Sequence, residues 1–334
     1  MGRGGLRREK SIKNSGEILN EGSITVLKES NYLVKPYKLD GNAPKQFIKA
    51  YFFEQNSTIR KTRSSSWNSY IAKTAEKWYP AESVIEYMIN RIGQVLGICM
   101  NEIKLVKANR QIRFLSRYFL SKNEKLIHGA EICGQHLGDM DMAEKIANHK
   151  NTARELFTFE FIKEAIRNVF PDNFENIIEK LVQLMVYDAI VGNNDRHFYN
   201  WGIIDTKQKT GNLPTFAPVY DTARALLWNE SDENCKHILK IHNEGGKKII
   251  NYLEGTCPRI SIESNTEANH FELIDFIKRY NNNYKNIVIN LLTKEKEERV
   301  MTMLNEEFAS FFIKERFELI LLILTKRYKK LREL

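Results

Sequence analysis

A dense polar cluster at residues 193–200 is the part of the sequence whose residue types and spacing could do chemistry. The apolar run before it ends at Gly192, a residue type that stops helices, so we predict a loop, called the polar loop below. It contains Asn193, Asn194, Asp195, Arg196, His197 and Asn200. Asp195 and Asn200 have the spacing D-x-x-x-x-N, in which phosphoryl-transfer enzymes use the aspartate to accept a hydroxyl proton and the asparagine to hold Mg²⁺. The alternative is a loop that only caps a helix, because Asn and Asp commonly bond nearby backbone groups.

A further carboxylate, Asp221, ends the apolar run of residues 216–220. A polar turn at residues 205–213 separates this run from the one that follows Asn200. We therefore predict a hairpin with Asn200 and Asp221 together at the end opposite the turn. One amide and one carboxylate there would make an oxygen-rich site that fits Mg²⁺ and leaves room for nucleotide phosphates.

The polar loop resembles the N-x-D-x-H-x-x-N loop of the bacterial, toxin-type HipA-like serine/threonine kinases, and residues 218–221, PVYD, are similar to their second metal-binding segment. The resemblance implies a two-lobed protein-kinase-like fold, ATP and Mg²⁺ as cofactors, and a protein substrate with a Ser or Thr hydroxyl. It implies that Asp195 is the catalytic base and that Asn200 and Asp221 hold the metal and the nucleotide. His197 follows the aspartate, and we expect its role to be structural. Some HipA-like kinases are toxins with a small DNA-binding antitoxin, which is therefore an implied partner.

The order of the predicted elements fits this α+β class. We expect a β-sheet with one major helix over residues 23–117, the N-lobe, in which two strands flank a turn at residues 108–110. We expect a mostly helical C-lobe over residues 118–334, with helices that include residues 152–169, 174–191 and 294–330. Residues 1–22 have three glycines in the first five positions and no apolar periodicity, which predicts a flexible tail.

Lys73 is the candidate for the lysine that contacts nucleotide phosphates. It ends a predicted strand, and Glu86 lies on the helix predicted over residues 81–96. A strand lysine followed by a helix glutamate is the ion pair that orients this lysine in kinases. Lys35 is the competing lysine, but a long insertion would separate it from the helix.

The segment before Lys73 is rich in serine and occupies the place where kinases hold a glycine-rich phosphate loop. We expect Ser64, Ser65 and Ser66 to donate hydrogen bonds to nucleotide phosphates, although close backbone approach is harder without glycine. The resemblance also implies autophosphorylation here, and the added charge would compete with the nucleotide. The alternative is an ordinary basic loop.

The composition describes a folded, basic protein. The 334 residues are 42% hydrophobic and carry a formal charge of +9. Residues 104–125 hold seven Lys or Arg against one Glu, which indicates either a nucleic-acid surface or a solvated basic face. The four cysteines show no metal or disulfide spacing, and neither a signal sequence nor a membrane span is present, so we predict a cytoplasmic protein.

Two other functions compete with a kinase. Asp188, Asp195, His197 and Asp221 could ligate the metal of a phosphohydrolase or nuclease. A catalytically dead kinase fold could instead bind RNA through residues 104–125, although the joint presence of Asp195, Asn200 and Asp221 argues against it.

Overall fold

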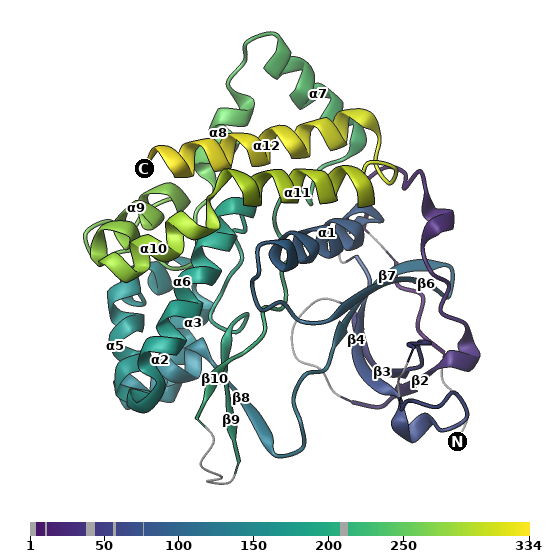
Figure 1. Cartoon of the computed structure of the whole chain (residues 1–334), viewed down its shortest axis with the longest axis horizontal. Coiled ribbons are helices and arrows are strands. Elements are labelled where there is room, and N and C mark those ends of the chain that lie inside the picture. Colours follow the sequence, from purple (N-terminus) through teal and green to yellow (C-terminus); the bar gives the residue numbers. More distant parts are fainter. Residues whose placement is uncertain (1–4, 11, 38–43, 56–57, 76, 208–212) are drawn as a thin grey trace.

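A five-stranded antiparallel sheet dominates the N-terminal third of the chain (Figure 1). Its strands are, in spatial order, β2 (Tyr32–Lys35), β3 (Lys45–Ala50), β4 (Asn68–Lys73), β7 (Gln111–Arg117) and β6 (Ile103–Ala108). Helix α1 (Ala81–Val95) packs against β6 and β7. The computed structural model describes residues 5–10, 12–37, 44–55, 58–75, 77–207 and 213–334.

The remaining strands form two small sheets. A three-stranded antiparallel sheet contains β8 (Glu124–His128), β9 (Gly202–Thr206) and β10 (Thr215–Phe216). A parallel pair joins β1 (Lys13–Asn14) to β5 (Trp78–Tyr79). Since β9 and β10 form the predicted hairpin, they bring the residues before β9 close to those after β10. The turn predicted between them lies partly outside the described residues.

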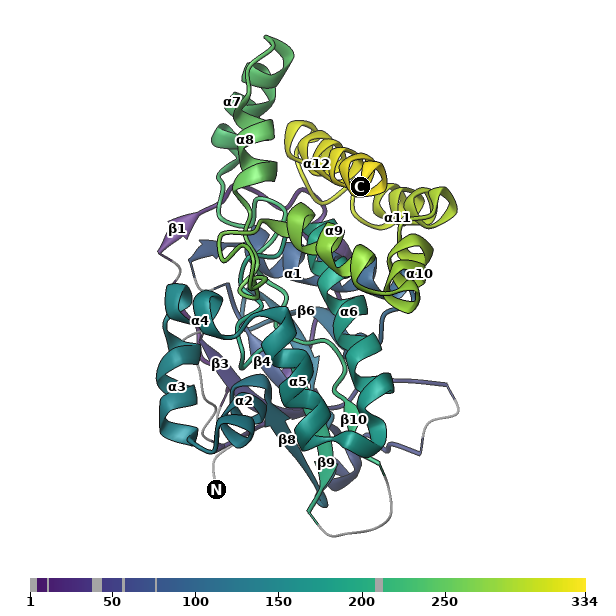
Figure 2. The ribbon, with the colours of Figure 1, turned by 90° about the vertical axis from the view of Figure 1, so that its left-hand side faces the viewer.

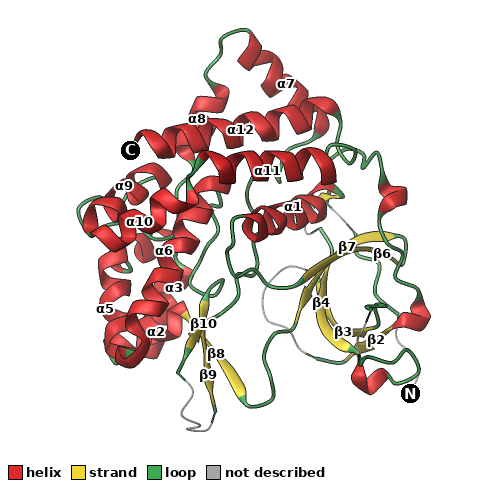
Figure 3. Ribbon diagram, viewed as in Figure 1, coloured by secondary structure: helices red, strands yellow, loops and turns green. Residues whose placement is uncertain are grey.

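Helices make up most of the chain after residue 128, as Figure 3 shows. The α-helices are α2 (Gly129–Leu137), α3 (Met140–Asn148), α4 (Lys150–Leu156), α5 (Phe159–Val169), α6 (Phe174–Val191), α7 (Asp232–Asn243), α8 (Lys248–Gly255), α9 (His270–Tyr280), α10 (Asn282–Leu291), α11 (Lys294–Glu307) and α12 (Lys314–Glu333). Short 3-10 turns are η1 (Glu21–Ser23), η2 (Glu29–Asn31), η3 (Ser64–Ser66) and η4 (Pro171–Asn173).

Helix α6 is the centre of the C-lobe core. Its second half, residues 184–191, is buried on all sides, and its neighbours α5, α9, α10 and α12 cover it. The helix ends at Gly192, whose φ of +74° is left-handed and whose N–H donates to the carbonyl of Asp188 at 2.8 Å. The polar loop therefore leaves a rigid, buried helix.

The predicted fold class is confirmed, with a sheet-rich N-lobe and a helical C-lobe. The helix predicted over residues 152–169 is broken, because the Thr158 side chain accepts a hydrogen bond from the N–H of Phe161 and starts α5. The helix predicted over residues 294–330 is likewise two helices, α11 and α12. Helix α2 and strand β8 were not predicted.

The N-terminal segment packs on the sheet, which contradicts the flexible tail predicted over residues 1–22. Leu6 is buried in the cluster on one face of the sheet. The N–H of Lys13 donates to the carbonyl of Lys77 at 2.9 Å. Residues 1–4 lie outside the described part of the chain.

The same segment continues into the C-lobe at Ser15. The Ser15 carbonyl accepts hydrogen bonds from the N–H of Asp232 and from Arg316 on α12, both at 3.0 Å, and Arg316 also pairs with the Asp232 carboxylate at 2.7 Å. Gly16 has a φ of +117°, and an added Cβ would lie 1.7 Å from a carboxylate oxygen of Asp232. Only glycine can therefore occupy the position where this segment passes Asp232.

Helices α7 and α8 stand out from the body of the C-lobe, with α12 beside them (Figure 2). Among the described residues, none of the helices combines the length and the apolar composition that a membrane-spanning helix needs.

Candidate active site

Lys73 lies at the end of β4, where it contacts two carboxylates from different parts of the chain. Its Nζ is 3.0 Å from Glu86 Oε1 on α1 and 2.8 Å from Asp221 Oδ1 after β10. The Lys73 and Glu86 side chains are 12% and 5% exposed. Lys35, the competing lysine, is exposed at the end of the edge strand β2. The structure therefore brings together Lys73, Glu86 and Asp221 and leaves Lys35 outside.

Burial and charge act against each other in this group. Burial raises the pKa of Glu86 to about 7, although the Lys73 ammonium acts in the opposite direction. Partial burial would also raise the pKa of Asp221, but the attraction of Lys73 dominates and lowers it to about 2. Burial opposes the charge of Lys73, yet the two carboxylates raise its pKa above the usual value. Lys73 and Asp221 are therefore both charged at neutral pH.

Hydrogen bonds within the polar loop fix its shape. The N–H of Asp195 donates to Asn193 Oδ1 at 3.1 Å, and Asn200 Nδ2 donates to the Asp195 carbonyl at 2.9 Å. The Asn200 amide nitrogen is thus used inside the loop, so Oδ1 is the atom that a cation would bind.

Arg196 fastens the polar loop to its surroundings. It is 4% exposed, and it forms two hydrogen bonds with the Asp188 carboxylate on α6, at 2.9 and 3.0 Å. Its Nη1 donates to the carbonyls of Asn200 at 2.9 Å and of Tyr220 at 2.7 Å. One guanidinium therefore holds together the backbones that carry Asn200 and Asp221. Sequence reasoning counted Arg196 only as a polar member of the loop.

The same contacts argue against the hydrolase alternative. Asp188 is 3% exposed and its carboxylate is paired with Arg196 and with Asn193 Nδ2, so it does not face an open metal site. Within the part of the chain that the structure describes, no group of three or more His, Cys, Asp or Glu side chains could hold a metal. His197 accepts a hydrogen bond on Nδ1 from the N–H of Tyr199 at 3.2 Å, and burial lowers its pKa.

Asp195 faces two arginines. Arg259 Nη2 is 2.8 Å from Oδ1 of its carboxylate, and Arg224 Nε is 3.2 Å from Oδ2. The Asp195 side chain is 16% exposed. Arg224 lies just after Asp221, but Arg259 is 64 residues away from Asp195 and no local sequence signal pointed to it.

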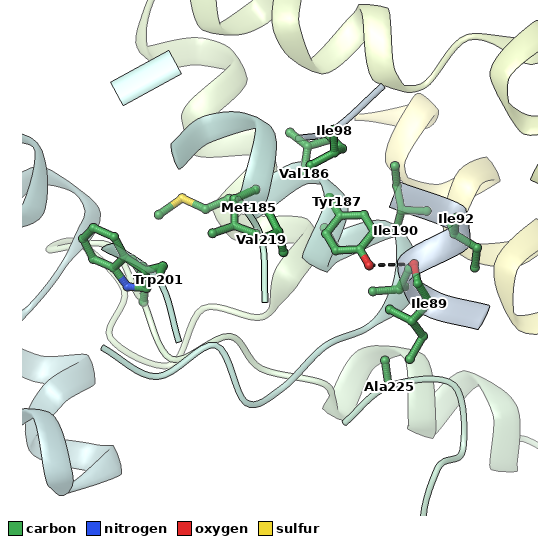
Figure 4. Packing of buried hydrophobic residues seen from close by; sticks show 14 of the residues in the cluster. Ile89, Ile92, Ile98, Met185, Val186, Tyr187, Ile190, Trp201, Val219 and Ala225 are labelled. Carbon is green, nitrogen blue, oxygen red and sulfur yellow. Dashed lines mark hydrogen bonds between the residues drawn. The ribbon is translucent and has the colours of Figure 1, made fainter. Parts of the chain in front are cut away.

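Helix α1 is bonded to the C-lobe next to the site. Asn90 Nδ2 donates to Thr222 Oγ1 at 2.6 Å, directly after Asp221. The Tyr187 hydroxyl on α6 donates to the Ile89 carbonyl at 2.8 Å, inside the apolar cluster shown in Figure 4. The position of Glu86 on α1 is therefore tied to the segment that carries Asp221.

The serines predicted to contact nucleotide phosphates are at the wrong end of the sheet. Ser64, Ser65 and Ser66 form η3, before the first residue of β4, whereas Lys73 is the last residue of that strand. A strand of this length spans roughly 20 Å at about 3.3 Å per residue. The Ser65 carbonyl accepts a hydrogen bond from Lys49 at 3.0 Å.

The pairing register places a different connection near Lys73. Lys45, the first residue of β3, lies opposite Lys73, so the link between β2 and β3 reaches that end of the sheet. Residues 38–43 of this link lie outside the described part of the chain. The predicted competition between a phosphorylated serine and the nucleotide therefore has no geometric basis.

The basic stretch at residues 104–125 is largely neutralised. Four of its cations lie within 4 Å of carboxylates: Lys104 beside Glu54 and Glu102, Lys107 beside Glu21, Arg117 beside Glu102, and Lys125 beside Asp205. Arg113 is 1% exposed and bonds backbone carbonyls and polar side chains. This pattern favours the solvated face over the predicted nucleic-acid surface.

Comparison with known proteins decides the family. The profile of the HipA-like C-terminal domain matches residues 37–304. The chain belongs to the HipA-like C-terminal domain family. This confirms the resemblance inferred from the polar loop and residues 218–221. No curated protein sequence matches the chain.

The fold of this HipA-like domain is similar to that of a solved kinase structure. The Helicobacter pylori proinflammatory kinase CtkA superposes with a TM-score of 0.64 at 16% identity, over 86% of this chain and 90% of that one. HipA of Shewanella oneidensis MR-1, solved with HipB and operator DNA, gives a TM-score of 0.35 at 14% identity, over 79% of this chain and 60% of that one. The CtkA match shows a kinase-like fold.

Proposed function

We propose that this HipA-like domain is an ATP- and Mg²⁺-dependent protein kinase that phosphorylates a serine or threonine hydroxyl. The observation that carries the proposal is the position of Lys73 Nζ, 3.0 Å from Glu86 and 2.8 Å from Asp221. A lysine paired with a helix glutamate and adjacent to a metal-binding aspartate is the arrangement that protein kinases need for phosphoryl transfer.

Each residue has a role in the proposed reaction. Lys73, held by Glu86, would bind the phosphates of ATP. The hydroxyl oxygen of the substrate attacks the γ-phosphorus, the bond from that phosphorus to the bridging oxygen breaks, and ADP leaves. Asp195 accepts the proton that the hydroxyl loses.

The donor set suits Mg²⁺. Asn200 and Asp221 offer an amide oxygen and a carboxylate, and Arg196 holds their backbones together. The Asp221 side chain is 43% exposed, so an ion that also binds phosphate oxygens has access to it. Bound there, Mg²⁺ would neutralise charge on the phosphates. The site has too few protein ligands for a metal held by the protein alone.

The partner and the modification are also proposals. A small DNA-binding antitoxin is proposed from family membership, since the HipA structure contains HipB and operator DNA. Autophosphorylation of η3 is proposed from resemblance alone, without the competition mechanism.

Incubation with γ-labelled ATP and Mg²⁺, with and without cell lysate, tests the proposed function. We expect labelled protein with the wild type, no label with Asp195→Asn, and full label with the exposed control Asp172→Asn. Label transfer that is equal in wild type and Asp195→Asn would contradict the assignment. Release of phosphate from a polynucleotide would support the hydrolase instead.

A further inference from the structure

Among the described residues of the polar loop, no arginine or lysine is free to contact the transferred phosphoryl group. In phosphoryl-transfer reactions an arginine or lysine stabilises charge on the γ-phosphoryl oxygens in the transition state. Arg196 is the arginine of the polar loop, but it is buried and its guanidinium is occupied by Asp188, Asn200 and Tyr220. An arginine that acts on these oxygens in addition to Lys73 therefore has to come from another part of the chain.

Arg259 reaches the base from the connection between α8 and α9. Its Nη2 lies 2.8 Å from Asp195 Oδ1, and its side chain is 22% exposed. Among the described residues, its buried Nε has no hydrogen-bond partner. The contact with Asp195 uses only Nη2, so the exposed part of the guanidinium, beside the carboxylate that receives the hydroxyl proton, can bond a second anionic oxygen.

A buried arginine of α4 holds the Arg259 connection in place. Arg154, which is 3% exposed, donates to the carbonyl of Pro258 and, at 3.0 Å, to that of Ala268. Ser261 in turn donates to the Arg154 carbonyl and accepts, through its own carbonyl, the N–H of Phe159 at 2.9 Å. Arg259 is therefore presented by a fixed backbone, as a preorganised electrostatic contact requires.

We propose that Arg259 is a further catalytic residue, whose guanidinium bonds an oxygen of the γ-phosphoryl group during transfer. The inference rests on the proposed kinase function. The Asp195 contact keeps the guanidinium at the point where the hydroxyl oxygen and the γ-phosphorus meet. Because the charge on the transferred group changes most in the transition state, Arg259 acts on the rate more than on the binding of ATP.

Arg224 has a different environment. Its side chain is 34% exposed, and its guanidinium lies over the Trp228 ring at 5.4 Å. It also follows Asp221 by three residues, and its carbonyl accepts the N–H of Asn194 at 3.4 Å. Arg224 therefore differs from Arg259 in its greater exposure and in its contact with an aromatic ring.

Calorimetry and kinetics on the full chain test the role of Arg259. The variants are Arg259→Gln, Arg259→Lys and the surface control Arg279→Gln, whose side chain is 74% exposed. The probes are Mg·ATP and a mixture of ADP, Mg²⁺ and aluminium fluoride, in which the fluoride mimics the transferred phosphoryl group in the transition state. We expect Arg259→Gln to bind Mg·ATP within about 3-fold of wild type, to lose binding of the fluoride mixture, and to transfer phosphate about 10³-fold more slowly. Arg259→Lys, which keeps the charge, should be intermediate.

The pH profile separates this role from simple positioning of Asp195. If Arg259 only held the Asp195 carboxylate in its charged form, its removal would move the acidic limb to higher pH, and the rate would recover there. Such recovery, or unchanged binding of the fluoride mixture, would overturn the inference while the wild type stays an active kinase. A wild type that binds no Mg·ATP would overturn the proposed function and this inference with it.

Discussion

The carboxylate of Asp188 on α6 and the guanidinium of Arg196 in the polar loop form a buried pair with two hydrogen bonds, at 2.9 and 3.0 Å. Asp188→Ala would leave the Arg196 charge buried without compensation, which typically costs about 3–5 kcal/mol of unfolding free energy. Urea unfolding measures the loss. Glu244→Ala is the matched control, because it removes an exposed pair with Lys240 and should cost about 0.5 kcal/mol or less. Equal losses for the two variants would contradict the account of the pair.

Asp195→Asn should separate catalysis from binding. A base acts mainly in the transition state, so phosphoryl transfer should fall by ~10²–10⁴ while Mg·ATP affinity stays within a few-fold. The two quantities are measured by label transfer and by calorimetry. A large loss of ATP affinity would indicate instead that Asp195 contributes to ATP binding before the reaction.

Asp221→Ala should weaken Mg-dependent binding of ATP as well as transfer. The variant removes a metal ligand and also one of the two carboxylates that contact Lys73. The comparison is made with and without Mg²⁺, because loss of a ligand affects only the Mg-dependent part of the affinity. Equal Mg·ATP affinity in wild type and variant would remove Asp221 from the metal site.

Glu86 should make stability depend on pH. Burial raises its pKa in the folded state to about 7 from an ordinary value of 4.5, so the folded protein binds more protons between these two values. The contribution of Glu86 is fully present below pH 4.5 and is lost as the pH rises through about 7. The difference in unfolding free energy between wild type and Glu86→Gln should therefore decline over that window. A difference that stays constant from pH 4.5 to pH 7 would contradict the raised pKa of Glu86.

Gly16→Ala should destabilise the protein by about 1–3 kcal/mol or more, since a left-handed φ is costly for alanine and the new Cβ would meet the Asp232 carboxylate. Gly22→Ala is the control, because nothing lies within 4 Å of its added Cβ. Thermal unfolding compares the two. A smaller loss for Gly16→Ala than for Gly22→Ala would contradict the tight crossing at Asp232.

The sequence predicted elements whose signals are local. Helix α6 begins and ends where its apolar run and Gly192 indicated, and the turn between β6 and β7 falls at Asn109 and Arg110, which both have positive φ. The break at Thr158 was missed, because apolar residues on both sides of it continue the helical pattern.

Site residues that belong to a local sequence motif could be predicted. Residues whose place depends on how the strands pair could not. The motif and the strand and helix order selected Asp195, Asn200, Asp221 and Lys73. The serines of η3 were misplaced, because a loop's composition does not say at which end of a sheet it lies. Arg259 was missed, since its approach to Asp195 depends on the packing of α4 against a distant connection.

The contacts of the N-terminal segment also determine the order in which parts of the protein can fold during synthesis. Ser15 leaves the ribosome early, but its carbonyl bonds Arg316, which lies 301 residues later in the chain. At about 5–20 residues per second, synthesis separates these two partners by roughly 15–60 s. During that interval the N-lobe sheet has to fold without the hydrogen bond between Ser15 and Arg316. The N-lobe is synthesised first, but this contact forms only after α12 has been synthesised.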